Sequence, residues 1–258
     1  MILATPTIKL AGLGYGTNQK ILIVFTYIYL YIKRRVGFLP AYSFKIKFLL
    51  LDKVRTLSIR DISDFWAIKD VFLDLEYDYN FNLETGKINI VDLGGNIGIS
   101  ALFFSLKYPN SSIFVFEPNP NVSSDLIFNL QSIENISIFP IAISNTSSDT
   151  KFYISKDRMH SSVVLGGDEV VNVRCITPTD IPSICNINQI DILKFDIEGA
   201  ETSLLNSFLG GVNNVVGEVH YDLINMSSAD IAAAFVNFEF YERVVVKNKR
   251  SIVYAKKK

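Results

Sequence analysis

Cysteine and histidine are scarce in this 258-residue chain, which has two of each. Cys175 and Cys185 show no CxxC spacing and no pairing with histidine, so the sequence indicates neither a zinc site nor a disulfide scaffold. We therefore expect the reduced thiols of a cytoplasmic protein. The net charge of −1 provides no basic excess for a nucleic-acid backbone, so nucleic acid is not expected as a partner.

Charge is also absent from an apolar run near the start, Ile21–Ile32 (ILIVFTYIYLYI). Its length of about 12 residues is too short to span a bilayer. The basic residues Lys33, Arg34 and Arg35 follow the run, whereas a secretory signal has them first. We expect an element of the mature protein that packs on the main domain or forms a homodimer interface. The alternative is a peripheral membrane contact, with the basic flank on anionic lipid.

The pattern of the chain changes near residue 85. Residues 1–85 are interpreted as an N-terminal extension with the apolar run, a β-like stretch at Ser43–Leu51 and a lead-in helix at Ser63–Leu75. In residues 86–258, apolar runs of strand length alternate with segments of helical length, as in βα units around a parallel sheet. The expected strands are Lys87–Leu93, Ser112–Glu117, Ile136–Ile141, Asp191–Asp196 and Val215–His220, and the expected helices are Ile97–Lys107, Asn121–Gln131 and Gly199–Leu209.

Two antiparallel hairpins complete the predicted fold. One pairs Lys151–Ser155 with Val170–Ile176, with Gly166 and Gly167 in its loop. The other pairs Phe238–Val246 with Ser251–Lys256 at the end of the chain. The predicted fold class is α/β: a doubly wound, Rossmann-like, mainly parallel sheet of seven strands that ends in this antiparallel hairpin.

The strongest motif is Val91–Gly98 (VDLGGNIG), a strand that ends in a glycine-rich turn and opens a helix. Ligands of doubly wound sheets bind outside the carboxyl ends of the strands, where this turn lies. Gly94 and Gly95 allow close backbone approach, and Gly98 allows the helix to pack near the strand. The spacing is not G-x-G-x-x-G, which disfavours a dinucleotide. The anion of Asp92 favours a cationic ligand instead.

Two further carboxylates follow buried strands. Glu117 ends the next strand (FVFEPNP), where it can accept hydrogen bonds from ribose hydroxyls. Asp196 ends the strand of LKFDIEGAE and would be costly to bury without a partner, whereas Glu198 and Glu201 can also serve as ordinary helix-dipole partners. Asp92, Glu117 and Asp196 are therefore expected to meet at one edge of the sheet.

The successive motifs VDLGGNIGIS, FVFEPNP, AIS, LKFDIEGAE and GEVH, over residues 87–222, resemble those of the FkbM methyltransferase family. This resemblance implies the class I methyltransferase fold, S-adenosylmethionine as cofactor and methylation of a hydroxyl on a sugar, glycan or other small molecule. The implied cofactor-binding residues are Asp92, Gly94, Gly95, Asn96, Gly98, Glu117, Asn119 and Ala142. The implied catalytic residues are Asp196, Glu198 and His220.

The acceptor side of the predicted site contains His220, which follows Glu218 at the end of a strand. The ordinary pKa of histidine suits it as a base, although a structural histidine remains an alternative. His160 is a candidate lid residue. We predict no metal; in a variant of the mechanism, Asp196, Glu198, Glu218 and His220 hold a divalent cation. The rival functions are a nicotinamide-dependent oxidoreductase and a non-catalytic, membrane-associated binding protein.

Overall fold

The computed structural model describes residues 4–81, 83, 86–155, 169–205, 209–246 and 249–258. Its centre is a seven-stranded sheet in the order β11–β12–β10–β9–β3–β4–β5. All pairs are parallel except those of β12, which runs antiparallel to both neighbours. The strands are β3 (Asn89–Leu93), β4 (Ser112–Phe116), β5 (Ile136–Phe139), β9 (Ile190–Phe195), β10 (Val212–His220), β11 (Phe238–Val246) and β12 (Arg250–Lys257).

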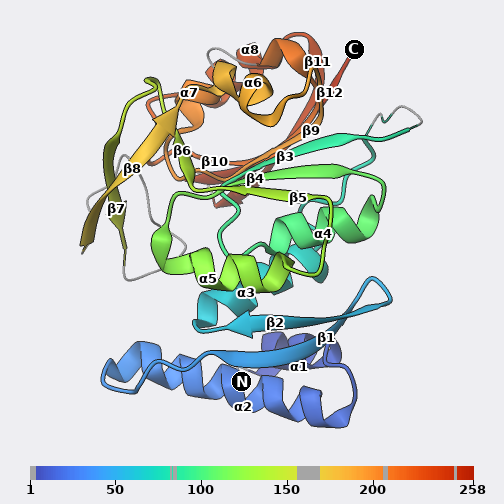
Figure 1. Cartoon of the computed structure of the whole chain (residues 1–258), viewed down its shortest axis with the longest axis vertical. Coiled ribbons are helices and arrows are strands. Elements are labelled where there is room, and N and C mark those ends of the chain that lie inside the picture. Colours follow the sequence, from blue (N-terminus) through green and yellow to red (C-terminus); the bar gives the residue numbers. More distant parts are fainter. Residues whose placement is uncertain (1–3, 82, 84–85, 156–168, 206–208, 247–248) are drawn as a thin grey trace.

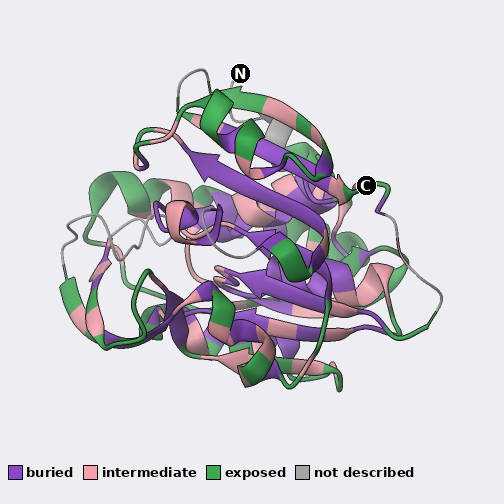
Figure 2. Cartoon of the chain, turned by 90° about the horizontal axis from the view of Figure 1, so that it is seen from above, coloured by how far each residue is buried: buried purple, intermediate pink, exposed green. Residues whose placement is uncertain are grey.

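Helices cover both faces of this sheet, so its strands are largely buried (Figures 1 and 2). One face carries α3 (Ile62–Phe72), α4 (Ile99–Lys107) and α5 (Pro120–Leu130). The other face carries α6 (Ile181–Cys185), α7 (Glu201–Leu205) and α8 (Ser228–Ala234), and short 3₁₀ turns lie at Pro178–Asp180 and Leu209–Gly211. The predicted doubly wound fold with its closing hairpin is confirmed.

Local sequence explains where these helices begin. Asp61 and Asp64 form a capping box at the start of α3, and Asn119 caps α5 ahead of Pro120. The expected helix Gly199–Leu209 is shorter in the described residues, where α7 begins at Glu201, because Glu198 and Gly199 both have positive φ and keep the backbone out of the helix.

One predicted strand is corrected. The run Ile136–Ile141 does not form a single strand, because Pro140 cannot donate to a sheet ladder. After it, β6 (Ile141–Ile143) leaves the main sheet and pairs in parallel with β8 (Glu169–Ile176). The hairpin of β7 (Thr150–Ile154) with β8 is confirmed. Gly166, Gly167 and His160 lie outside the described residues.

The N-terminal layer consists of α1 (Ala4–Gly12), α2 (Thr17–Val36) and the hairpin of β1 (Phe44–Leu50) with β2 (Lys53–Ile59). It lies beneath α3 and α5, with α2 at the foot of the molecule (Figure 1). The apolar run is helical, and β2, which we did not predict, completes a hairpin with the expected strand. A single buried cluster joins this layer to α4 and to strands of the main sheet. The domain boundary at residues 85–86 remains a prediction.

Candidate active site

The glycine turn after β3 begins where two strands come very close together. Gly94 has φ +78°, and a Cβ on it would lie 1.8 Å from the backbone oxygen of Asp196. No residue with a side chain fits there without moving β9. Asn96 also has positive φ, at +46°. The turn is therefore held in a conformation that keeps its backbone open at the carboxyl edge of the sheet.

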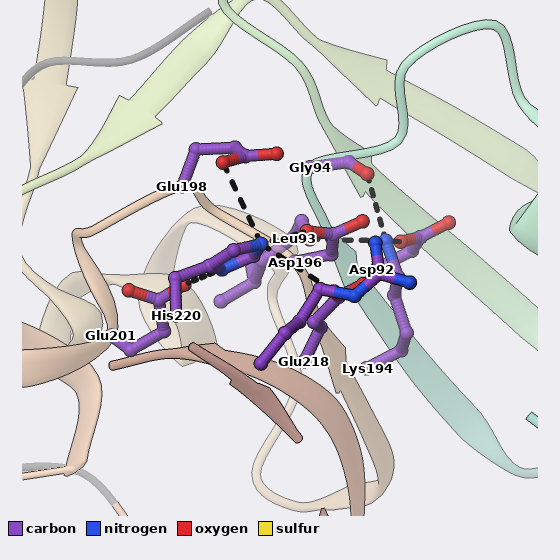
Figure 3. Close-up of polar contacts among 10 residues, drawn as sticks. Asp92, Leu93, Gly94, Lys194, Asp196, Glu198, Glu201, Glu218 and His220 are labelled. Atoms are coloured by element: carbon purple, nitrogen blue, oxygen red, sulfur yellow. Dashed lines mark hydrogen bonds and ion pairs between the residues drawn. The ribbon is translucent and has the colours of Figure 1, made fainter. Parts of the chain in front are cut away.

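Asp92 lies beneath this turn and is fully buried. Its Oδ1 is 3.0 Å from Lys194 Nζ, and its Oδ2 accepts a 2.5 Å hydrogen bond from Ser100 Oγ. Lys194 Nζ also donates to the carbonyl oxygens of Gly94 at 2.8 Å and of Leu93 at 3.3 Å (Figure 3). The charge of Asp92 is thus balanced within the protein, and its contact with the positive charge of a cofactor stays a prediction.

Seven of the predicted residues come together around a cavity of about 630 Å³. They are Gly94, Asn96, Glu117, Asn119, Ala142, Asp196 and Glu198. The side-chain oxygens Asn96 Oδ1 and Asp196 Oδ1 are buried there without a hydrogen bond from the described residues, so they are available to a ligand.

Gly95 and Gly98 serve packing. A Cβ on Gly95 would lie 2.2 Å from Val115 Cγ1 of β4. Gly98 faces Leu126 and Leu130 of α5, and a Cβ there would lie within 3.0 Å of both leucines. The sequence predicted that Gly98 lets the following helix pack near the strand, and the structure adds that Gly98 lies against the neighbouring helix α5. Contact of either glycine with a cofactor stays a prediction.

Glu117 is held rigidly at the end of β4. Its Oε2 accepts a hydrogen bond from the Asn96 backbone N–H at 2.7 Å, and its Oε1 accepts one from the Asn119 N–H at 2.8 Å. Burial raises the pKa of Glu117 to about 7, against the two backbone donors, which lower it. Both oxygens keep acceptor capacity toward the cavity, as ribose recognition requires.

A second charge cluster surrounds His220, which is 6 % exposed. Its Nδ1 lies 2.7 Å from Glu201 Oε1, and its Nε2 lies 3.5 Å from Glu198 Oε2 and 3.9 Å from Asp196 Oδ1 (Figure 3). Burial lowers the pKa of His220, but the bond to Glu201 and the charges of the nearby carboxylates outweigh it and raise the pKa to about 10. A protonated His220 would not act as the base at neutral pH, so this pKa disfavours the predicted role, which stays a prediction.

Glu218 completes this cluster from β10. Its Oε1 lies 3.6 Å from His220 Nε2 and also pairs with Arg250 of β12. Burial and the charge of Asp196 raise the pKa of Glu218 to about 9, although His220 and Arg250 oppose the shift. The cluster thus concentrates carboxyl groups around one imidazolium.

Asp196, Glu198 and His220 also have the chemistry of a metal site. Each offers one ligand atom, and the three atoms lie within 4.8 Å of one another. The bond from Glu201 to the other ring nitrogen of His220 matches the way proteins orient metal-binding histidines. Glu198 has φ +47°, an uncommon conformation for glutamate that is often found at functional sites. These residues could hold a divalent cation.

A second cavity, of about 510 Å³, shares Gly94, Asn96 and Asp196 with the first. Its wall includes Glu76 and Tyr77, which follow the lead-in helix α3. Lys194, Glu218 and Arg250 also line this cavity. The sequence analysis did not predict that Glu76, Lys194 or Arg250, which pairs with Glu218, would line the site. Lys194 had a visible signal, since it is the one charged residue between Ile192 and Phe195 in a buried strand.

The strand order and the glycine turn after β3, with carboxylates at the ends of β4 and β9, define a class I methyltransferase fold. The sequence model described as the methyltransferase FkbM domain matches residues 92–241, more than half of the chain. The chain belongs to the FkbM methyltransferase family. Its cofactor is S-adenosylmethionine, as this family implies, and the oxidoreductase and non-catalytic alternatives are set aside.

Individual relatives agree with this assignment. Methyltransferase 1 of Beauveria bassiana (strain ARSEF 2860) is 28% identical over 183 residues, which cover 61% of this chain and 69% of that protein. The 2-O-methyltransferase NoeI of Sinorhizobium fredii (strain NBRC 101917 / NGR234) is 23% identical over 134 residues, which cover 45% and 55%. Among solved structures, that of Aeropyrum pernix fibrillarin with natively bound S-adenosyl-L-methionine has a TM-score of 0.42 to this chain at 16% identity, and the match covers 70% of this chain and 71% of that one.

Proposed function

We propose that this methyltransferase transfers the methyl group to a hydroxyl oxygen of a sugar, glycan or other small-molecule acceptor. The observation that carries the proposal is the carboxylate of Asp196 at the junction of two cavities. A hydroxyl must lose its proton as its oxygen attacks, so an O-methyltransferase needs a proton acceptor beside the transferred methyl. One relative, the 2-O-methyltransferase NoeI, is named for methylation at oxygen, which supports an oxygen acceptor here.

The cofactor would lie across the junction of the two cavities. Glu117 would accept hydrogen bonds from the ribose hydroxyls in the first cavity, and the backbone of Gly94 to Asn96, which lines the cavities, would lie beside the cofactor. When bound, S-adenosylmethionine supplies an electrophilic methyl group on a positively charged sulfur. The carboxyl-rich cluster around His220 is electrostatically suited to a cation at that point.

Asp196 accepts the hydroxyl proton on its carboxylate. His220 remains protonated, and its charge stabilises the carboxylates of Glu198 and Asp196, which lie 3.5 Å and 3.9 Å from Nε2, while Glu201 orients the ring through Nδ1. Positioning of the acceptor supplies a large part of the rate, because the displacement must be in line. Cys175 and Cys185 are buried free thiols, which supports a reducing, cytoplasmic setting for this reaction.

Asp196→Asn tests the proposal. The amide keeps the shape of the side chain but cannot take the proton, so turnover should fall by about 10²- to 10⁴-fold. The substrate source is a cell extract, the reagent is S-adenosylmethionine with a labelled methyl group, and mass spectrometry locates the label on the product. Calorimetry should show nearly unchanged cofactor affinity.

The matched control is Asp52→Asn, an exposed aspartate in the β1–β2 turn with positive φ that asparagine tolerates. It should behave as the wild type in both measurements. Label found on nitrogen or carbon, or full turnover in Asp196→Asn with intact cofactor binding, would show that the proposed acceptor chemistry is wrong.

A further inference from the structure

The outward face of α2 carries a continuous apolar stripe. The buried face of the helix contains Ile23, Tyr27 and Leu30, which pack inside the N-terminal layer. The outward residues recur at spacings of four, three, four and four, so they share the opposite face. Their exposed fractions are 49 % for Ile21, 66 % for Phe25, 48 % for Ile28, 44 % for Ile32 and 43 % for Val36.

This stripe lies on the outside of the molecule. Figure 1 shows α2 as the element farthest from the main sheet, with no described segment beneath it. Phe38, just beyond the helix C-cap at Gly37, is 80 % exposed and extends the apolar surface. Single exposed apolar side chains are ordinary, but a row of five on one helix marks an interaction surface.

The charges of the chain are divided between this layer and the rest of the protein. Residues 1–51 contain seven of the 25 Lys and Arg residues and none of the 26 Asp and Glu residues, so residues 52–258 hold the other 18 basic and all 26 acidic residues. The near-neutral total therefore conceals a strongly basic start and an acidic remainder. Lys20 precedes the stripe, and Lys33 and Arg35 stand at its far end.

We propose that α2 lies flat on an anionic membrane surface, with Phe25 and Ile28 at the centre of the inserted stripe and the basic residues of the layer on the lipid phosphates. Apolar insertion and basic flanks together are the two signals that stable interfacial binding requires. Lys20 and Lys33 can reach the headgroups while their alkyl stems follow the apolar face.

The charge division favours a lipid surface over a second copy of the chain. Pairing two stripes would bring two layers of the same positive sign together, and like charges across an interface are unfavourable. An anionic bilayer is complementary in both charge and apolarity. Among the described residues, no helix has the length and uncharged composition needed to cross a bilayer.

Vesicle flotation of the full chain tests the proposal. The probe is phosphatidylcholine vesicles with about 30 % phosphatidylserine, compared with pure phosphatidylcholine. We expect binding to the anionic vesicles that weakens as salt rises from about 0.1 to about 0.5 M. Phe25→Ser/Ile28→Ser should weaken binding at least about tenfold, because both side chains lose their apolar insertion.

The control Val236→Ser/Val244→Ser removes two equally exposed apolar side chains elsewhere and should bind as the wild type. Similarly, Lys33→Gln/Arg35→Gln should weaken binding, whereas Lys87→Gln/Lys151→Gln should not. Absence of anionic-vesicle binding, or equal binding by Phe25→Ser/Ile28→Ser with an unchanged melting temperature, would overturn the proposal. Light scattering that shows a dimer, lost in Phe25→Ser/Ile28→Ser and without vesicle binding, would assign the stripe to a second copy.

Discussion

Two buried charge clusters lie at the same edge of the sheet and are balanced in different ways (Figure 3). In the cluster beneath the glycine turn, the carboxylate of Asp92 meets the ammonium of Lys194 and the hydroxyl of Ser100. In the cluster around His220, one imidazolium and the guanidinium of Arg250 face four carboxyl groups. The first cluster is electrically complete, and the second is rich in acid.

The difference separates a structural role from a functional one. Lys194 also donates to two carbonyls of the turn, so the complete cluster supports the backbone on which a cofactor would lie. The acidic cluster has more carboxyl groups than cations, so it favours binding of a further cation or a proton. Its residue Asp196 lines both cavities. Strongly shifted pKa values beside a cavity are typical of functional sites.

Lys194→Met should break the complete cluster and have the largest effect. It removes the cation but leaves Asp92 buried, which typically costs about 3–5 kcal/mol. Denaturant unfolding measures the loss of free energy of unfolding. The double variant Asp92→Asn/Lys194→Met, which removes both charges, should recover a large part of it. A loss below about 1 kcal/mol in Lys194→Met would mean that the pair does not support the turn.

Glu201→Gln should alter the acidic cluster. It removes the partner of His220 Nδ1, so the pKa of His220 should fall from about 10 by about one to two units. The chain has only two histidines, so a proton NMR titration resolves His220, assigned with His220→Gln. A wild-type midpoint near 6.5 would instead return His220 to the role of a base.

The same variant, Glu201→Gln, tests how the free energy of unfolding depends on pH. The folded pKa of His220 lies above its ordinary value of 6.5, so its pairing stabilises the fold fully below pH 6.5 and is lost as pH rises through about 10. The difference in free energy of unfolding between the wild type and Glu201→Gln should therefore shrink across that range. Chemical denaturation at fixed pH values measures it, and a difference that grows with pH would contradict the assignment.

Glu117 extends the comparison to the cofactor end of the first cavity. Its pKa of about 7 means that the carboxylate, the better acceptor for ribose hydroxyls, forms only as pH rises through 7. Cofactor affinity should weaken by up to about tenfold per pH unit below 7 and level off above it. Calorimetry checks this, and Glu117→Gln should bind weakly at every pH. An equally steep slope in Glu117→Gln would place the titrating group elsewhere.

Sequence patterns were sufficient for the main sheet but not for these clusters. Apolar runs predicted the parallel strands, and the signal was plainest for β3, β9 and β10, because these strands are buried on both faces. The β2 strand was missed, since its first residues are exposed and its pattern KVRTLSI mixes charge with apolar residues. The break at Pro140 follows from the sequence, because proline cannot donate to a sheet ladder, whereas the pairing of β6 with β8 depends on tertiary geometry.

The site shows the same limit. Glu117 and Asp196 were found because each follows a buried strand, and strand ends converge at one edge. From the sequence, Glu201 could equally be a helix-dipole partner, whereas the structure shows it hydrogen-bonded to His220 Nδ1. The pKa of His220 could not be read from its residue type, because it depends on burial and on the carboxyl groups of Asp196, Glu198 and Glu201, which the fold places around the ring. Which face of α2 remains uncovered likewise depends on tertiary packing.

The smallest effect on methyl transfer is expected from removal of divalent cations. This experiment decides whether a proton or a metal ion balances the carboxyl groups of the acidic cluster. At neutral pH a proton occupies the Nε2 of His220 that a metal ion would need, because the pKa is about 10 and metal competes with protons for histidine. Methyl transfer should therefore persist within about twofold after chelation. Loss of activity that magnesium restores in the wild type but not in Glu198→Gln would instead show that Asp196, Glu198 and His220 hold a cation. The cluster would then be completed by a metal ion, and the proton on His220 would be a property of the metal-free protein alone.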